Sequence, residues 1–238
     1  MPLYKIAGIN IEIAAKYSYL PKLCKKYECD ETKAQISLCV SEEEIDKEMG
    51  GPLGQYSRGY CESVCAHRKL GLILPEFDAY VMHASAFTID GEGYAVTAKS
   101  GTGKSTHTRL LRELLGKRAD IINGDKPIIR LKDGVPYACG SPWCGKENWS
   151  KNRCARLKGI IYLERSAENF IEPLDKKTAA RLIMGQIFRP SEADKLSKIL
   201  SLVDKTLEYT DTWRLGCDIS QDAAKLSYST ITGAKNEN

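Results

Sequence analysis

The feature that most constrains the fold is a glycine-containing loop between an apolar run and an amphipathic segment. Residues 95–111 read AVTAKSGTGKSTHTRLL. The run before the loop is rich in strand-forming residues, and the segment after it has leucines at helical spacing up to Gly116. A loop between a strand and a helix suits phosphate binding, because the helix directs its positive end at the loop. The chain is therefore expected to bind a nucleotide.

The residue types of this loop suit a nucleoside triphosphate with Mg²⁺. Two glycines permit backbone turns that direct N–H groups inward, Lys104 reaches the β and γ phosphates, and Ser105 can hold the metal ion. Ala98 stands where the pattern has its first glycine. The alternative is a glycine-rich turn without a ligand. The residues predicted to bind ATP are Ser100, Gly101, Thr102, Gly103, Lys104, Ser105 and Thr106.

Two further residues are predicted to act with Lys104 in catalysis. Asp125 follows the apolar strand in ADIINGDKP, where a carboxylate can act on Mg²⁺ together with Ser105 or accept a proton from a hydroxyl nucleophile. The alternative for Asp125 is a turn residue, since Asn-Gly-Asp favours turns. His83 lies on the strand before the loop, where it is either catalytic or an ordinary core or surface histidine.

A basic segment near residues 140–159 is predicted to be a functional loop. Its sequence, GSPWCGKENWSKNRCARLKG, combines glycine, proline and two tryptophans with several cations. Lys146, Arg153 and, further on, Arg165 are candidates for binding an anionic substrate or the transferring phosphoryl group. A basic loop that only faces water is the alternative.

The pattern of the chain predicts a small N-terminal α/β unit over residues 1–54, a core over 55–232 and a disordered tail over 233–238. In the core, a hairpin joins residues 80–89 to 94–98, and a second joins 127–132 to 135–140 around an Asp-Gly turn. Later elements are a strand at 156–165, helices at 176–188 and 191–209, and a strand at 212–219. The apolar residues of the second helix, predicted to face the core, are Leu196, Ile199, Leu200, Val203 and Leu207.

Composition excludes several classes of function. The net charge of +4 is too small for a dedicated nucleic-acid binder, and no nucleic-acid partner is expected. No run approaches the ~18 apolar residues of a membrane helix, and the first residues do not form a signal peptide, so a cytoplasmic protein without a membrane partner is expected. The nine cysteines are scattered without a CxxC pair and predict neither a disulfide framework nor a zinc site.

The order of these motifs resembles a known family. A hairpin with His83, the run SGTGKST, an apolar strand leading to Asp125 and a second hairpin are similar to the C-terminal kinase domain of HPr kinase/phosphorylase, which is related to phosphoenolpyruvate carboxykinase. The resemblance covers about residues 78–165. It implies an α/β fold with a mixed, largely antiparallel sheet, a P-loop that binds ATP and Mg²⁺, and His83, Lys104, Ser105 and Asp125 at the active site.

This chain departs from the family at the acidic pair, of which only Asp125 remains, followed by Lys126. The resemblance therefore does not imply a reverse, phosphorylase-type reaction. The runs INGDKP and SPWCGKE are most similar to short stand-alone HPr-kinase-like proteins of bacteria. By the same resemblance, a homo-oligomer is expected.

The function predicted from these residues is an ATP-dependent kinase that transfers the γ phosphate to a hydroxyl. The acceptor is a serine of a peptide or protein, or a small molecule, and the residues do not choose between them. One alternative is a nucleotide-binding sensor or scaffold that transfers no phosphate. A weaker alternative is a reaction like that of phosphoenolpyruvate carboxykinase.

Overall fold

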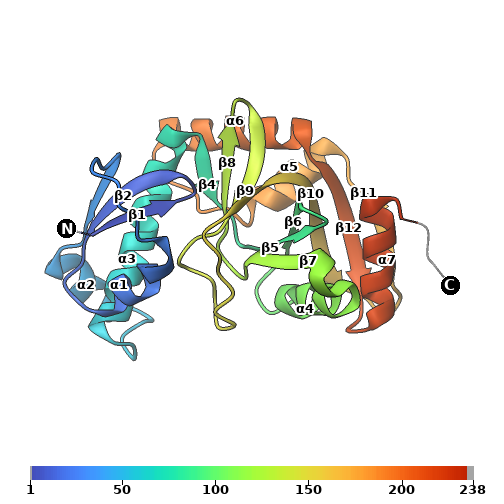
Figure 1. The fold of residues 1–238 in the computed structure, drawn as a ribbon, viewed down its shortest axis with the longest axis horizontal. Coiled ribbons are helices and arrows are strands. Elements are labelled where there is room, and N and C mark those ends of the chain that lie inside the picture. The colour runs from blue at the N-terminus through green and yellow to red at the C-terminus, as the bar shows by residue number, and fades with distance from the viewer. Residues whose placement is uncertain (1, 235–238) are drawn as a thin grey trace.

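The computed structural model describes residues 2–234, so residues 235–238 of the predicted tail lie outside the described residues. A small sheet with its helices lies at the N-terminal end, and a larger sheet with helices on both faces forms the rest (Figure 1). The fold is therefore a mixed α/β fold, as predicted.

The small sheet is built from a hairpin and one added strand. β1 (Leu3–Ile6) and β2 (Ile9–Ala14) are antiparallel, and β3 (Ile36–Cys39) joins β2 in parallel. The helical elements of this part are α1 (Tyr19–Cys24), η1 (Lys25–Tyr27), α2 (Glu42–Met49), α3 (Arg58–Ile73) and η2 (Leu74–Phe77). α2 begins with a reciprocal capping box between Ser41 and Glu44.

The large sheet is mixed, as predicted, with two parallel and six antiparallel strand pairs. Its strands run in the order β4-β8-β9-β10-β6-β5-β7, while β12 pairs with the long strand β10, and β11 with β12. The strands are β4 (Ala79–Val81), β5 (Ala84–Ile89), β6 (Glu92–Thr97), β7 (Ala119–Asn123), β8 (Ile128–Lys132), β9 (Val135–Cys139), β10 (Cys154–Arg165), β11 (Phe170–Pro173) and β12 (Asp211–Cys217).

Helices cover both faces of this sheet (Figure 1). On one face lie α4 (Lys104–Leu115), with the short η3 (Gly116–Arg118), and α7 (Gln221–Thr232). On the other lie α5 (Lys176–Met184) and α6 (Ala193–Tyr209). A third apolar cluster joins α3 and the small sheet to β4 and β8. None of the helices within residues 2–234 combines the length and the apolar character needed to cross a membrane.

The strand directions bring several loops to one edge of the sheet. β6 is parallel to β10, which is parallel to β12, and β5 is antiparallel to both β6 and β7. The carboxyl ends of β6, β7, β10 and β12 therefore lie at the same edge, where α/β sheets commonly bind ligands. The segments that follow these strands include the 98–105 loop and Asp125.

Three sequence-based expectations are corrected. The run at 80–89 is two strands separated at Met82 and His83, because Met82 forms an isolated bridge with Ile187. Leu200, predicted to be in the core, is 49% exposed.

The third correction is a disulfide between Cys139 and Cys154. These cysteines are paired residues of the antiparallel strands β9 and β10, a relation that sequence spacing does not reveal. Disulfides are rare in the reducing cytosol, so the cytoplasmic location stays a prediction.

Two neighbouring residues of α6 test the packing. Ile199 is 1% exposed, whereas Leu200 is 49% exposed. Ile199→Ala should lower the free energy of unfolding by about 2–4 kcal/mol, because it leaves a cavity. Leu200→Ala should cost less than about 1 kcal/mol. Urea unfolding measures both changes, and equal losses would contradict the orientation of α6.

Candidate functional site

The 98–105 loop connects β6 to α4, and two of its glycines have left-handed backbone conformations. Gly101 has φ +74° and Gly103 has φ +125°. A Cβ at either position would meet no atom within 4 Å, so backbone conformation and not lack of space requires glycine here. The loop is braced by Thr102, whose hydroxyl donates to the Lys99 carbonyl at 2.8 Å.

The predicted nucleotide-binding residues follow one another along this loop and the first turn of α4. Ser100 and Gly101 are exposed, and Ser105 and Thr106 are half-buried in the helix. Lys104 is 7% exposed, and its Nζ donates to the Ala98 carbonyl at 3.3 Å. Burial lowers the pKa of Lys104, while the negative charge of Asp125 acts in the opposite direction. Among the described residues, no carboxylate forms a hydrogen bond with Lys104.

Asp125 lies between His83 and Lys126. Its Oδ1 is 3.2 Å from Nε2 of His83, and its Oδ2 is 3.2 Å from Nζ of Lys126. Burial alone would raise the pKa of Asp125, but the hydrogen bond from His83 and the charge of Lys126 outweigh burial and lower the pKa to about 2. The carboxyl group is thus ionised at neutral pH.

Asn123, which sequence reasoning missed, shapes the turn that presents Asp125. Its side chain is fully buried at the end of β7. Its Oδ1 accepts hydrogen bonds from the backbone N–H of Asp125 at 2.9 Å and of Lys126 at 2.7 Å. Its Nδ2 donates to the Ser141 carbonyl at 2.9 Å. This Asx-type turn was signalled only by the turn-favouring dipeptide Asn123-Gly124.

A second missed residue, Gln186, holds His83. The backbone N–H of His83 donates to the Gln186 carbonyl at 2.7 Å, and Nδ1 of His83 is 3.1 Å from Oε1 of Gln186. The His83 carbonyl accepts from the Thr97 hydroxyl at 2.8 Å, which links it to the end of β6. His83 is therefore fixed between the 98–105 loop and Asp125. Its hydrogen-bond partners lie far away in sequence, so no local pattern identifies them.

The segment between β9 and β10, residues 140–153, packs over Asp125. Gly145 has φ +79°, and a Cβ there would lie 3.0 Å from the Cβ of Asp125. Trp143 anchors the segment to α3, since its Nε1 donates to the Ser63 hydroxyl at 3.0 Å and its ring lies 4.9 Å from that of His67. The runs INGDKP and SPWCGKE thus meet in space.

The three predicted substrate-binding cations lie in different places. Arg165, at the end of β10, donates from Nη2 to the Gly101 carbonyl at 2.6 Å. Lys146 follows Gly145, is exposed and forms no ion pair within residues 2–234. Arg153 is turned away from the site and pairs with Asp120 at 2.8 Å. The structure therefore brings Arg165 to the 98–105 loop and keeps Lys146 beside the Asp125 turn, but it does not bring Arg153 there.

Two cavities flank the 98–105 loop. One, of about 510 Å³, lies between residues 99–102 and the end of β10 at residues 162–165. The other, of about 380 Å³, lies between the start of α4 and the end of β12, and its lining includes His107, Leu110 and Ile219. Ile219 is 77% exposed, and Nδ1 of the buried His107 has no hydrogen-bond partner. The second cavity thus has both apolar side chains, such as Leu110 and Ile219, and polar ones, such as Ser166 and Asp218, beside the loop.

The residues of the site fit a metal ion that is coordinated partly by the protein and partly by the phosphates of a nucleotide. Within residues 2–234 no group of three or more His, Cys, Asp or Glu side chains could hold a metal ion alone. Asp125 supplies an ionised carboxylate, and the Ser105 hydroxyl makes no hydrogen bond among the described residues. Oxygen ligands of this kind, few in number, are typical of Mg²⁺ that is bound together with phosphates.

No family model and no curated protein match this chain by sequence. Among solved structures, the chain is similar to the Hpr(Ser) kinase/phosphatase from Coxiella burnetii, with 14% identity over 52% of this chain and 93% of that one. The TM-score is 0.30, which indicates only a distant structural relation. The function must therefore be argued from the residues of the site.

The low pKa of Asp125 has a measurable consequence. The folded-state value of about 2 lies below the ordinary 3.8, so the ionised group stabilises the fold above about pH 4, and this contribution is lost as the pH falls towards 2. In urea unfolding, the stability difference between the wild type and Asp125→Asn should shrink between pH 5 and pH 2.5 by up to about 2 kcal/mol. A difference that does not change with pH would contradict the pairing with His83 and Lys126.

Proposed function

We propose that this protein is an ATP-dependent phosphotransferase that acts on a hydroxyl group. The observation that carries the proposal is the meeting, at one sheet edge, of a glycine loop with a buried lysine and a fixed carboxylate. Phosphoryl transfer needs mainly positioning and charge stabilisation, and these residue types supply both. The resemblance of the motifs to HPr kinases supports the same reaction class.

The 98–105 loop would bind the triphosphate. Left-handed glycines at 101 and 103 orient backbone N–H groups for phosphate oxygens, and the first turn of α4 adds its positive end. Within residues 2–234 no carboxylate is hydrogen-bonded to Lys104, so its ammonium group would be available to the β and γ phosphates. Arg165 already contacts the loop and would bind the transferring group. Ser105 and Asp125 would hold Mg²⁺, which neutralises phosphate charge when bound.

Asp125 would orient the acceptor hydroxyl and hold the metal ion more readily than it would take a proton. A carboxylate with a pKa of about 2 is a weak base, and its two oxygens face His83 and Lys126. His83 is held by Gln186 through Nδ1, and its Nε2, which now faces Asp125, would donate to the transferred phosphoryl group once the metal ion takes its place at Asp125. The acceptor, a serine of a peptide or protein or a small molecule, would approach from the side of residues 140–153.

The 380 Å³ cavity beside α4 would receive the nucleoside. It continues from the loop, since Thr102 and Gly103 line it, and it carries apolar side chains suited to the face of a base. Ser166 and Asp218 line the same cavity and would supply polar atoms for a base or ribose.

A second candidate function is nucleotide sensing without transfer. The observation that favours it is the engagement of both Asp125 oxygens, one by His83 and the other by Lys126, so that neither oxygen is free for a metal ion or an acceptor. A protein that binds ATP but forms no ADP with any acceptor in a cell extract would favour this function.

Lys104→Ala should abolish transfer while preserving the fold. Loss of a cation that acts on the transferring phosphate typically costs about 100-fold or more in kcat. The assay is incubation with γ-labelled ATP and a cell extract, read as ADP formed and label transferred, alongside the thermal unfolding midpoint. Lys205→Ala, on the exposed face of α6, is the matched control. ATP consumption by Lys104→Ala at the wild-type rate would rule out the proposal.

The nucleoside cavity is tested by Ile219→Asp. Ile219 is exposed, so the fold should tolerate the change, but a charge at the rim should weaken ATP binding about tenfold. Binding of inorganic tripolyphosphate, which lacks a nucleoside, should change by less than about twofold. Titration calorimetry with both ligands measures this, and equal weakening of the two would place the nucleoside elsewhere.

A further inference from the structure

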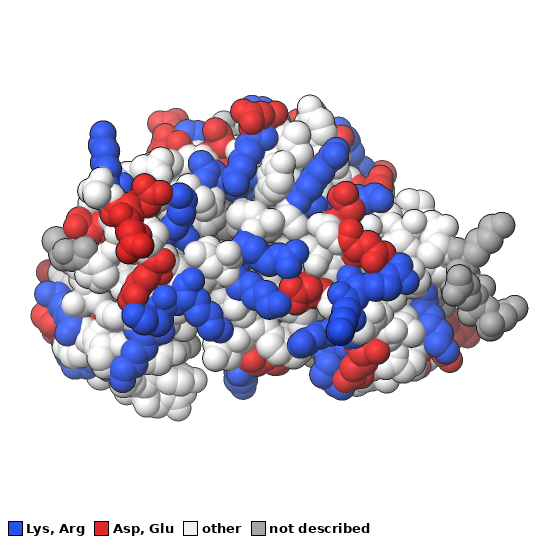
Figure 2. Space-filling view, in the orientation of Figure 1, with Lys and Arg blue, Asp and Glu red and all other residues white. Residues whose placement is uncertain are grey.

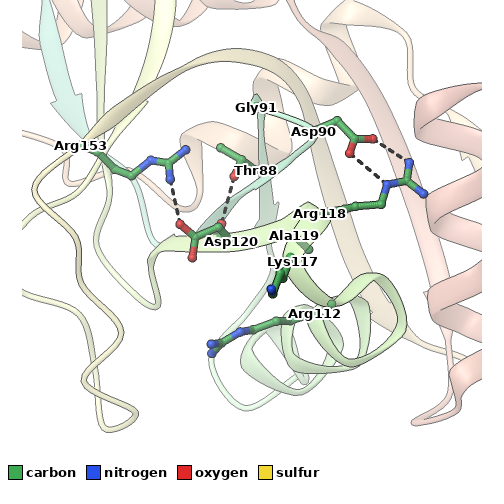
Figure 3. A pocket seen from close by; sticks show the side chains of 10 residues that line it. Thr88, Asp90, Gly91, Arg112, Lys117, Arg118, Ala119, Asp120 and Arg153 are labelled. Atoms are coloured by element: carbon green, nitrogen blue, oxygen red, sulfur yellow. Dashed lines mark hydrogen bonds and ion pairs between the residues drawn. The ribbon is translucent and has the colours of Figure 1, made fainter.

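A second concave site lies away from the Asp125 cluster, where β7 begins. Its volume is about 770 Å³, and it is bounded by the β5–β6 turn, the end of α4 with η3, and Arg153 (Figure 3). This is the opposite end of β7 from Asn123 and Asp125. Asp125 lies five positions after Asp120, a separation of at most about 17 Å along the chain.

Most of the cations around this site are held in place. Arg118 makes two hydrogen bonds to Asp90, at 3.0 and 2.7 Å, and a third to the Tyr228 hydroxyl at 2.9 Å. Asp120 pairs with Lys151 at 2.6 Å and with Arg153 at 2.8 Å. Both carboxylates of the site are thus already shared among fixed cations.

Two other cations of the site have no such partner. Arg112, at the end of α4, and Lys117, in η3, are exposed and form no ion pair within residues 2–234. In Figure 3 both side chains extend into the space below β7, while Arg153 reaches Asp120 from the other side. Lysine and arginine also gather over the β7 and α4 region in the space-filling view (Figure 2). The site therefore has unsatisfied positive charge.

The geometry excludes two kinds of anion as the best ligand. No aromatic side chain lines the site, so nucleic-acid bases have no stacking surface. The site lies at the carboxyl end of α4, whose carbonyl groups carry the negative end of the helix dipole and disfavour a compact phosphate. Separate carboxylates along an extended chain place less negative charge at this helix end, because each can contact a different cation.

We infer that this face binds an acidic segment of a partner polypeptide, with Arg112 and Lys117 as its main contacts. Arg118, Lys151 and Arg153 add a fixed positive border on which carboxylates can share the guanidinium and ammonium groups. The site is separate from the proposed nucleotide site, and binding there does not depend on phosphate transfer.

The probe is a fluorescently labelled peptide of alternating glutamate and glycine, with binding read as fluorescence anisotropy on the full chain at low and physiological salt. Arg112→Gln/Lys117→Gln should weaken binding about fivefold, the effect of losing two exposed charge pairs. Lys177→Gln/Lys205→Gln removes the same charge from exposed positions of α5 and α6 and should leave the affinity within about twofold. Higher salt should weaken binding by the wild type.

Equal affinities of the two double variants would overturn the inference. It would also be overturned if tripolyphosphate or a single-stranded oligonucleotide bound more tightly than the peptide and lost more affinity on Arg112→Gln/Lys117→Gln. Lys104→Ala should bind the peptide as the wild type does. Phosphate transfer and peptide binding are therefore measured separately. The proposed function can be wrong while the peptide site is right, and the reverse.

Discussion

The buried side-chain amide of Asn123 joins the segments on which the candidate site depends. Its oxygen accepts from two consecutive backbone N–H groups of the Asp125 turn, and its nitrogen donates to the start of the 140–153 segment. A buried N–H left without an acceptor costs about 1–3 kcal/mol, so this one side chain strongly favours the observed turn. The direction of the Asp125 carboxylate follows from that turn.

Around this carboxylate the charge is mostly positive. His83 and Lys126 contact its two oxygens, and Lys104 lies close enough for its pKa to respond to Asp125. Arg165 adds a further cationic side chain, which contacts the loop itself. A site of this kind favours a ligand with several negative charges, which is why a nucleoside triphosphate with its metal ion fits it better than a neutral metabolite.

The sequence could predict the features that depend on local pattern. The glycine loop, the two hairpins and the strand leading to Asp125 rest on turn residues and periodicity within a few positions, and the structure contains all of them. Gln186 could not be assigned a role, because its partner His83 lies 103 residues away. For Asn123 the sequence shows a turn, but not that its amide also bonds Ser141, 18 residues further on. Leu200 was placed in the core because it lies next to the apolar face of its helix. The sequence does not show which edge of that face is covered by the rest of the protein.

The sequence also did not show which of the predicted substrate-binding cations lie at the site, because this depends on contacts between distant segments. Arg153 and Arg165 are both in or beside β10, yet one pairs with Asp120 and the other contacts Gly101. Their separation depends on the length of β10. The first part of β10 pairs with β9, and the later part lies between β6 and β12. The disulfide between Cys139 and Cys154 likewise depends on strand register, which spacing along the chain does not give.

The most direct test of the central claim is a crystal structure with a non-hydrolysable ATP analogue and Mn²⁺ in place of Mg²⁺, located by anomalous scattering. The account predicts triphosphate oxygens on the backbone amides of residues 101–105, with the manganese signal between Ser105 and Asp125. A triphosphate bound elsewhere, or a metal ion on phosphate oxygens with Asp125 still held by His83 and Lys126, would contradict it.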